Sequence, residues 1–202
     1  MKHNLTACSM LMAAMITFSF NTLLAQEMSK NTCTALHVNP HPPIIDGALN
    51  DEVWQKDNWC SGFTQHEPHN GAEPSQQTEF MITYDNDYLY AAFRLHDTEP
   101  DKIVARVTRR DDIEGDFVAI GIDSYFDKRT AFIFCVSASG TKMDMVMTEN
   151  GDREDPNWDP IWWAKTARNP NGWTAEMKIP LNQLRFSAAD VQTWGIQVGR
   201  HL

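Results

Sequence analysis

The sequence has no long segment with helical apolar periodicity, no internal repeat and few basic residues. The first absence argues against a βαβ architecture, in which helices connect the strands. Asp and Glu outnumber Lys and Arg by 27 to 17, and the formal net charge is −10. Because an acidic surface repels phosphate backbones, nucleic acid is not an expected partner.

Catalytic signatures are also missing. The chain has no Gly-x-Ser-x-Gly elbow, phosphate-binding loop or dinucleotide-binding glycine motif, and no histidine pair has the spacing of a zinc protease. Glycoside hydrolysis needs two carboxyl groups across a cleft, and Glu176 is predicted to face outward from its strand without such a partner. The sequence therefore favours a binding protein over a self-sufficient enzyme.

One stretch is apolar enough to concern a membrane. A basic start precedes an almost wholly apolar run from Met10 to Leu24, and Ala25 offers a small residue for cleavage. The run is shorter than the roughly 20 residues that span a bilayer, so a secretory signal is favoured over an anchor. We predict a signal peptide at 1–25, a flexible lead-in at 26–37 and one domain at 38–202. The protein is then exported to the periplasm, cell surface or medium, and does not span the membrane.

Four cysteines are present, and Cys8 belongs to the predicted signal peptide. Export permits a disulfide, for which Cys33 and Cys60, both near the start of the mature chain, are the candidate pair. Cys135 lies within an apolar strand pattern and is predicted to be a buried thiol.

Alternation of apolar and polar side chains predicts many short strands. Residues 78–84 and 89–96 form a hairpin around the turn residues Asp85, Asn86 and Asp87. Further strands are expected at 117–124, 130–137, 142–147, 173–179 and from 194, with short helical turns at 50–54 and 181–184. Such a series predicts an all-β protein folded as an antiparallel β-sandwich.

Five segments, in this order along the chain, resemble a family 9 carbohydrate-binding module: 44–54, 84–93, 116–123, 172–180 and 194–198. The resemblance covers about residues 38–200. It implies a jelly-roll-like sandwich that binds sugars, usually with structural calcium. The segments at 109–111 and 184–186 further resemble the N-terminal domain of large bacterial envelope proteins, which would supply a C-terminal region as a partner.

The resemblance also implies a sugar site, which this chain matches in part. Ala119 and Cys135 stand near the positions where a glutamate and an arginine are expected, and Ile113-Glu114-Gly115 replaces the first of two clamping tryptophans. Gln197 matches a polar contact. The second tryptophan would follow Gln197, where the chain has ended, so we expect the domain to be incomplete at its C-terminus.

The segment around Trp158, Trp162 and Trp163 is the densest aromatic cluster. It can form a stacking platform for sugar rings, with Trp158 and Trp162 as ligand contacts, or alternate members can fill the sandwich core. Arg110 is a further candidate contact, because a guanidinium recognises paired oxygens; salt bridging with its acidic neighbours is the alternative.

Acidic side chains crowd the loop before this cluster. Asp152, Asp155 and Asp159, with Glu154, are the candidate ligands for calcium, which binds several oxygens on a flexible loop. A solvated acidic loop is the alternative interpretation.

We therefore expect non-catalytic binding of a polysaccharide or oligosaccharide, associated with carbohydrate catabolism. Two alternatives remain. The domain can dock to the remainder of a larger envelope protein without a sugar ligand, or it can be a fragment of a glycoside hydrolase-associated protein.

Overall fold

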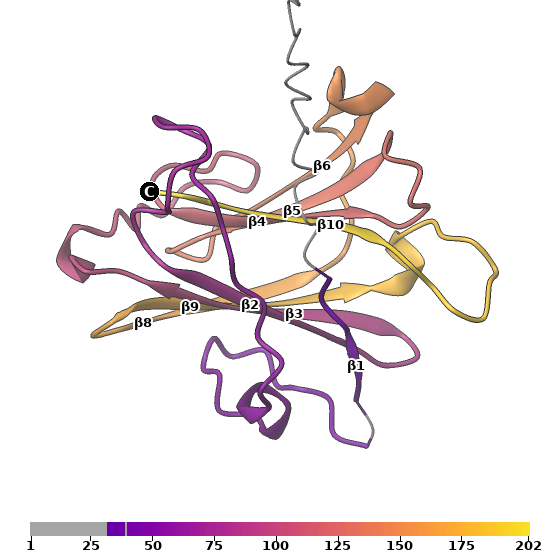
Figure 1. Ribbon diagram of the computed structural model, residues 1–202, viewed down its shortest axis with the longest axis horizontal. Helices are drawn as coiled ribbons and strands as arrows, with labels where there is room; N and C mark the ends of the chain where they lie inside the picture. The colour runs from indigo at the N-terminus through magenta and orange to yellow at the C-terminus, as the bar shows by residue number, and fades with distance from the viewer. Residues whose placement is uncertain (1–31, 39) are drawn as a thin grey trace, which may run out of the picture. The chain divides into compact units, whose positions relative to one another are not determined.

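The protein is described by a computed structural model that covers residues 32–38 and 40–202; the predicted signal peptide lies outside these residues. Two five-stranded sheets face each other (Figure 1). The first sheet has the order β1 (Leu36–His37), β2 (Thr78–Tyr84), β3 (Tyr88–His96), β9 (Gly172–Pro180) and β8 (Trp163–Asn169). The second has the order β10 (Gly195–His201), β4 (Phe117–Asp123), β5 (Ala131–Ser137), β6 (Lys142–Thr148) and β7 (Arg153–Asp155).

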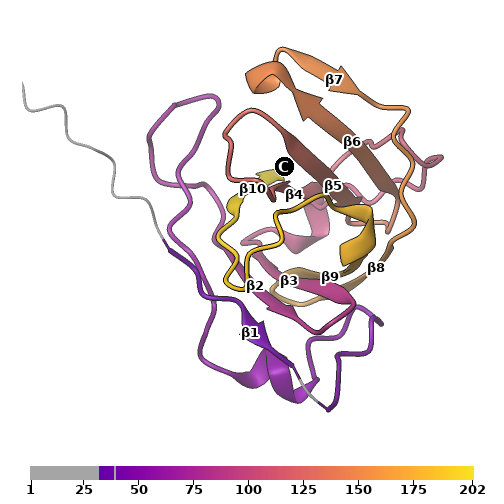
Figure 2. The ribbon, with the colours of Figure 1, turned by 90° about the vertical axis from the view of Figure 1, so that its right-hand side faces the viewer.

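The strand pairs are antiparallel except β1 with β2, so the predicted antiparallel β-sandwich is confirmed. β10 pairs with β4 along its whole length at one edge of the second sheet, and β7 forms the other edge (Figure 2). Among the described residues the helical elements are single 3₁₀ turns: η1 (Glu52–Gln55), η2 (Pro100–Lys102), η3 (Glu149–Gly151) and η4 (Leu181–Gln183). No helix in the described part of the chain is long and apolar enough to cross a membrane.

The main core lies between the two sheets and follows from the period-2 pattern. Side chains alternate between the two faces of a strand, so every second residue points into the sandwich. On β9 the inward residues are Trp173, Ala175, Met177 and Ile179, all of them buried, as the sequence predicts. They pack against the inward residues of β4 and β5, which include Ile120 and Phe134.

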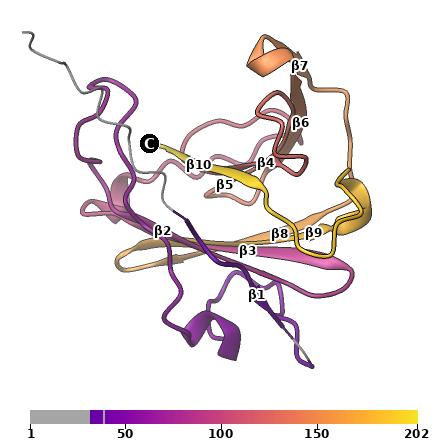
Figure 3. The same ribbon diagram turned by 45° about the vertical axis from the view of Figure 1, so that its right-hand side comes forward.

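A second apolar cluster covers the outer face of the first sheet. Val38, Val53 and Trp54 pack there against outward-facing residues of β2 and β3, including Met81 and Tyr90. Figure 3 shows the segment that carries η1 on this side of the sheet. The candidate pair Cys33 and Cys60 forms a disulfide, and Cys60 is joined to Phe80 of β2 by backbone hydrogen bonds. The disulfide therefore joins the two ends of the covering segment, and backbone hydrogen bonds hold its second end against β2.

This cover buries Glu176, whose predicted exposure is wrong. Its carboxylate accepts hydrogen bonds from the backbone N–H groups of Asp46 (3.0 Å) and Gly47 (2.7 Å) and from the indole N–H of Trp54 (2.8 Å). Glu176 does face away from the main core, as the alternation requires. The residues that enclose it come from 120 to 130 positions earlier in the chain, which strand periodicity does not reveal.

The structure adds elements that the sequence pattern did not predict. β8 begins at Trp163 within the segment interpreted as an aromatic loop, and β1 lies inside the predicted flexible lead-in. The first helical turn begins at Glu52 with Asp51 as its N-cap, rather than with Asn50. The turn at 85–87 is as predicted, because one carboxylate oxygen of Asp85 accepts the N–H groups of Asp87 and Tyr88.

Candidate functional site

Of the seven tryptophans, all within the described residues, Trp163 alone is largely exposed, at 46 %. Trp162, its neighbour, is 2 % exposed. β8 starts here, and successive residues of an extended chain point to opposite faces, so Trp162 enters the core while Trp163 stands on the outer face of the first sheet. The Trp162 indole N–H donates to Oδ1 of Asp144 at 2.7 Å, which satisfies its polar atom.

Trp163 borders a shallow groove, which we name the Trp163 groove, at the rim of the segment that covers the first sheet. Its volume is about 330 Å³. The residues that line it are Pro43, Ile44, Ile45, Trp163, Ala164, Lys165 and Lys178. Trp163 and Lys178 are cross-strand partners on β8 and β9, so the sheet register places an ammonium group beside the indole.

The groove combines an aromatic surface with polar donors. The Nζ atom of Lys178 lies 3.9 Å from the ring centroid of Tyr88 and 5.6 Å from that of Trp163. The rings of Tyr88 and Trp163 meet edge to face, with centroids 6.2 Å apart. An indole can pack against the C–H face of a sugar ring, while lysine N–H groups donate to hydroxyl or carboxylate oxygens.

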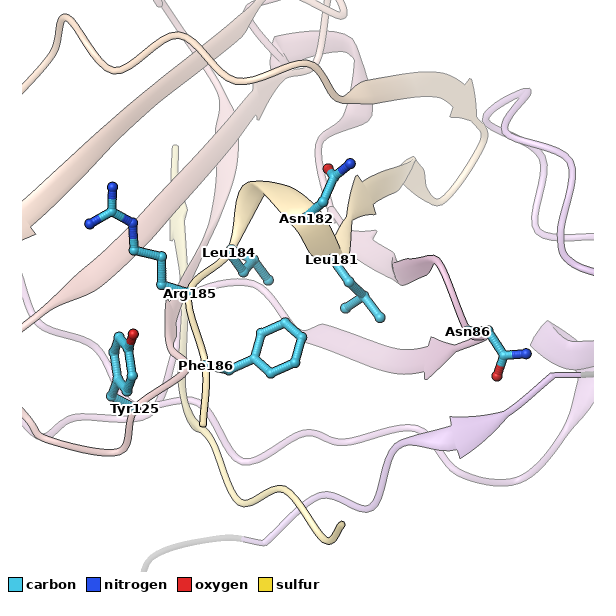
Figure 4. Close-up of a pocket in the computed structure, with 7 residues that line it drawn as sticks. All are labelled: Asn86, Tyr125, Leu181, Asn182, Leu184, Arg185 and Phe186. Carbon is cyan, nitrogen blue, oxygen red and sulfur yellow. The ribbon is translucent and has the colours of Figure 1, made fainter. Parts of the chain in front are cut away.

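A second pocket, of about 460 Å³, lies where η4 follows β9, and we name it the end pocket. Figure 4 shows the residues that line it: Asn86, Tyr125, Leu181, Asn182, Leu184, Arg185 and Phe186. In this view the ring of Phe186 lies between Tyr125 and Leu181, and the guanidinium of Arg185 extends away from that ring (Figure 4). The end pocket therefore offers aromatic and amide surfaces, without a charged group directed at its rings.

Arg110, a predicted ligand contact, is engaged by acidic groups of the protein itself. Its Nη2 lies 2.6 Å from Oδ1 of Asp144 and 2.5 Å from Oδ1 of Asp159, and it donates to the carbonyl oxygen of Pro160 at 3.1 Å. Burial raises the pKa of Asp144, which the Trp162 hydrogen bond and the charge of Arg110 oppose. The salt-bridged alternative fits this arginine, whose Nη2 already contacts three acceptor oxygens.

The other two predicted tryptophan contacts are also packed inward. Trp158 is half-buried, with its ring 5.1 Å from that of Phe132 and 5.5 Å from that of Phe134. Trp162 lies 5.2 Å from Phe134. The structure thus brings Trp158, Trp162 and Arg110 together at the second sheet, as a structural cluster in which the Trp162 ring has no accessible face for a sugar.

Gln197 lies apart from this cluster, exposed on the edge strand β10 opposite Gly121. It shares the outer face of the second sheet with Ala119 and Cys135, which are cross-strand partners. The three positions that the resemblance names therefore lie on one face of the sheet. That face is largely apolar here, because Met143 and Met145 of β6 continue the row. Cys135 is the buried thiol that the sequence predicts, and burial raises its pKa to about 12.

The predicted calcium ligands Asp152, Asp155 and Asp159 do not converge. Asp159 pairs with Arg110, while Asp155 accepts hydrogen bonds from the backbone and side chain of Asn157 at 3.1 Å. Within residues 32–38 and 40–202, no three His, Cys, Asp or Glu side chains are grouped closely enough to hold a metal ion. The donor set expected for calcium is therefore not assembled in the described part of the chain.

A family model and three solved structures similar to this chain all concern carbohydrate-binding proteins. The family described as carbohydrate family 9 binding domain-like matches residues 45–199. A family 9 module from Caldicellulosiruptor kristjanssonii, solved with glucose and with cellotriose, superposes with TM-scores of 0.51 and 0.53 at 18 % and 19 % identity. These alignments cover 82 % of this chain and 76 % and 75 % of the module.

A Bacteroides uniformis protein, described as a candidate carbohydrate-binding protein, has a TM-score of 0.58 at 11 % identity, over 83 % of this chain and 81 % of that one. At such identities the structural likeness concerns the fold. No curated protein matches the chain.

Proposed function

This chain belongs to the carbohydrate family 9 binding domain-like family, and from that premise we propose that it is a non-catalytic carbohydrate-binding module that holds its sugar in the Trp163 groove. The family 9 module of Caldicellulosiruptor kristjanssonii, whose fold this chain shares, was solved with glucose and with cellotriose. A glucose-type saccharide is therefore the first ligand class to consider.

The observation that carries the location is the exposed indole of Trp163 beside the ammonium of Lys178. A large apolar ring at the surface of a protein with net charge −10 has a cost in water, which a stacked sugar face would remove. The groove supplies lysine donors for the polar edge of the same sugar. Its lining residues include no carboxyl group, so the proposal contains no catalytic step.

We place this activity outside the cytoplasm, in carbohydrate catabolism. The pattern of residues 1–25 supports export, and the Cys33–Cys60 disulfide is compatible with an oxidising compartment. In that setting the module would hold a polysaccharide or oligosaccharide near a catalytic partner or a larger C-terminal region.

The experiment is a screen of the purified protein against immobilised glycans, followed by calorimetry with cellotriose and other binders. We expect Trp163→Ala to weaken binding at least about tenfold, because the stacking surface is lost. Trp158→Ala is the matched control, since its ring packs against Phe132 and Phe134. Phe186→Ala tests the end pocket. If Phe186→Ala abolishes binding and Trp163→Ala does not, the location is wrong.

A docking domain without a sugar ligand is the second candidate. The observation that favours it is the apolar outer face of the second sheet, where Ala119 and Cys135 stand at the expected polar positions and Met143 lies beside Cys135. Failure of the folded protein to bind any glycan would favour this candidate and overturn the first.

A further inference from the structure

The Trp163 groove carries two lysines that form no ion pair within the described residues, although Glu176 is the cross-strand partner of Lys165. Lys165 is on β8 and Lys178 on β9, and both line the groove. Within the described residues neither takes part in an ion pair. Acidic residues outnumber basic ones by 27 to 17, so a surface with two lysines outside any ion pair stands out against the rest of the molecule.

The ammonium group of Lys178 is held in place by aromatic rings. Its Nζ lies 3.9 Å from the centroid of Tyr88, 5.6 Å from that of Trp163 and 5.9 Å from that of Tyr90. Such cation–π contacts fix the position of the charge and leave the ammonium N–H groups free to donate. A cation that is already positioned loses less conformational freedom when a ligand binds.

Two acidic side chains near these lysines accept hydrogen bonds from other donors. The Asp85 carboxylate accepts the N–H groups of Asp87 and Tyr88 and the hydroxyl of Tyr90. The Glu176 carboxylate accepts three N–H groups beneath the covering segment. Neither lies within ion-pair distance of Lys178, so the lysine charge is available to a ligand.

We propose that the Trp163 groove selects saccharides that contain uronic acid, with the sugar ring stacked on Trp163 and its carboxylate between Lys165 and Lys178. This inference rests on the proposed function and names its ligand class. Charge complementarity supports it, because a carboxylate has two acceptor oxygens and a negative charge that both lysines can bind at once.

The test uses the full protein and fragments of alginate, polygalacturonate and hyaluronan, each paired with its carboxyl-reduced form, which has the same length but no charge. We expect calorimetry to show at least one acidic fragment bound about threefold to fivefold more tightly than its reduced form at low ionic strength. Salt should reduce that preference. Lys178→Gln and Lys165→Gln should each diminish it, while Trp163→Ala should weaken both forms.

Lys128→Gln is the matched control, because Lys128 also lies over an aromatic ring, that of Phe126 at 5.9 Å, but on the loop between β4 and β5. Equal binding of charged and reduced fragments would overturn the uronate preference and leave the proposed function standing. A preference that survives both lysine substitutions would also overturn it. Binding of no saccharide, charged or neutral, would overturn both proposals.

Discussion

The contacts of Gly47 with β8 and β9 explain why the covering segment has a glycine at this position. Gly47 adopts φ +92°, and a Cβ atom there would lie 2.8 Å from the carbonyl carbon of Thr166. Its N–H donates to Glu176 and its carbonyl accepts the hydroxyl of Thr174 at 2.7 Å. Only a residue without a side chain allows the covering segment to approach β8 and β9 this closely.

Substitution of Gly47 by alanine is therefore expected to destabilise the fold more than loss of a left-handed glycine alone. Gly71 is the matched control, because it has φ +81° and a Cβ atom there would meet nothing within 4 Å beyond its own chain neighbours. We expect Gly71→Ala to cost about 1 kcal/mol and Gly47→Ala about 3 kcal/mol or more. Chemical denaturation measures both, and equal losses would contradict the close-packing explanation.

Glu176 makes the stability of the fold depend on pH. Burial raises its pKa from 4.5 to about 7, against the opposing effect of its N–H donors. The folded protein therefore binds the proton more readily than the unfolded chain between these values. The stability contributed by Glu176 is fully present below about pH 4.5 and is lost as the pH rises through about 7.

Glu176→Gln tests this dependence, because glutamine does not titrate. Its NH₂ group must face either the Trp54 indole N–H or two backbone N–H groups, so we expect a loss of about 1–3 kcal/mol at pH 5. The difference in unfolding free energy between wild type and variant should shrink from pH 4.5 to pH 7. A constant difference across that range would contradict the raised pKa.

At the scale of elements, sequence periodicity predicted strands well where both faces have a clear character. β9 alternates buried and outward residues, and the hairpin of β2 and β3 has acidic turn residues. β8 was missed because its outward residues are Trp163, Lys165 and Ala167 and its inward ones Ala164 and Thr166, which gives no polar–apolar alternation. The adjacent Trp162 and Trp163 must point oppositely, but only the sheet register decides which one faces the core.

The salt bridge between Arg110 and Asp144 joins the loop before β4 to strand β6. Asp144 is 1 % exposed and would remain as a buried carboxylate without its arginine. We expect Arg110→Ala to destabilise the fold by about 1–3 kcal/mol and to leave glycan affinity unchanged. Arg109→Ala, at an exposed neighbour, should have little effect on either. A loss of glycan affinity without loss of stability would restore Arg110 as a ligand contact.

The disulfide joins the start of the covering segment to the residue that bridges to β2. Cys33 and Cys60 are separated by 27 residues, and a loop of this length corresponds to about 3–4 kcal/mol in the chain-entropy treatment. The double variant Cys33→Ser with Cys60→Ser should therefore unfold at lower denaturant concentration. Cys135 is buried and unpaired, so its thiol should not exchange with this disulfide. We expect a thiol reagent to modify Cys135 in the native protein more slowly than it modifies a free cysteine peptide. Equal rates would contradict the burial of Cys135.

For the whole molecule, the fold was predictable and the site was predictable only in part. The sandwich follows from local alternation and turn residues, which a sequence displays directly. The Trp163 groove is assembled from residues 43–45, β8 and β9, so it depends on tertiary pairing. Gln197, Ala119 and Cys135 share one face, which the sequence alone does not reveal, and only Gln197 among them has a polar side chain.

The link between Gly47 and Glu176 also sets an order in time. The two residues are 129 positions apart, so at a synthesis rate of about 5–20 residues per second Glu176 follows Gly47 by roughly 6–26 s. During that interval the nascent covering segment has no β9 against which to close, and its Trp54 lacks the acceptor that it has in the folded protein. The segment around Gly47 consequently cannot reach its final place until β9, made much later, is present.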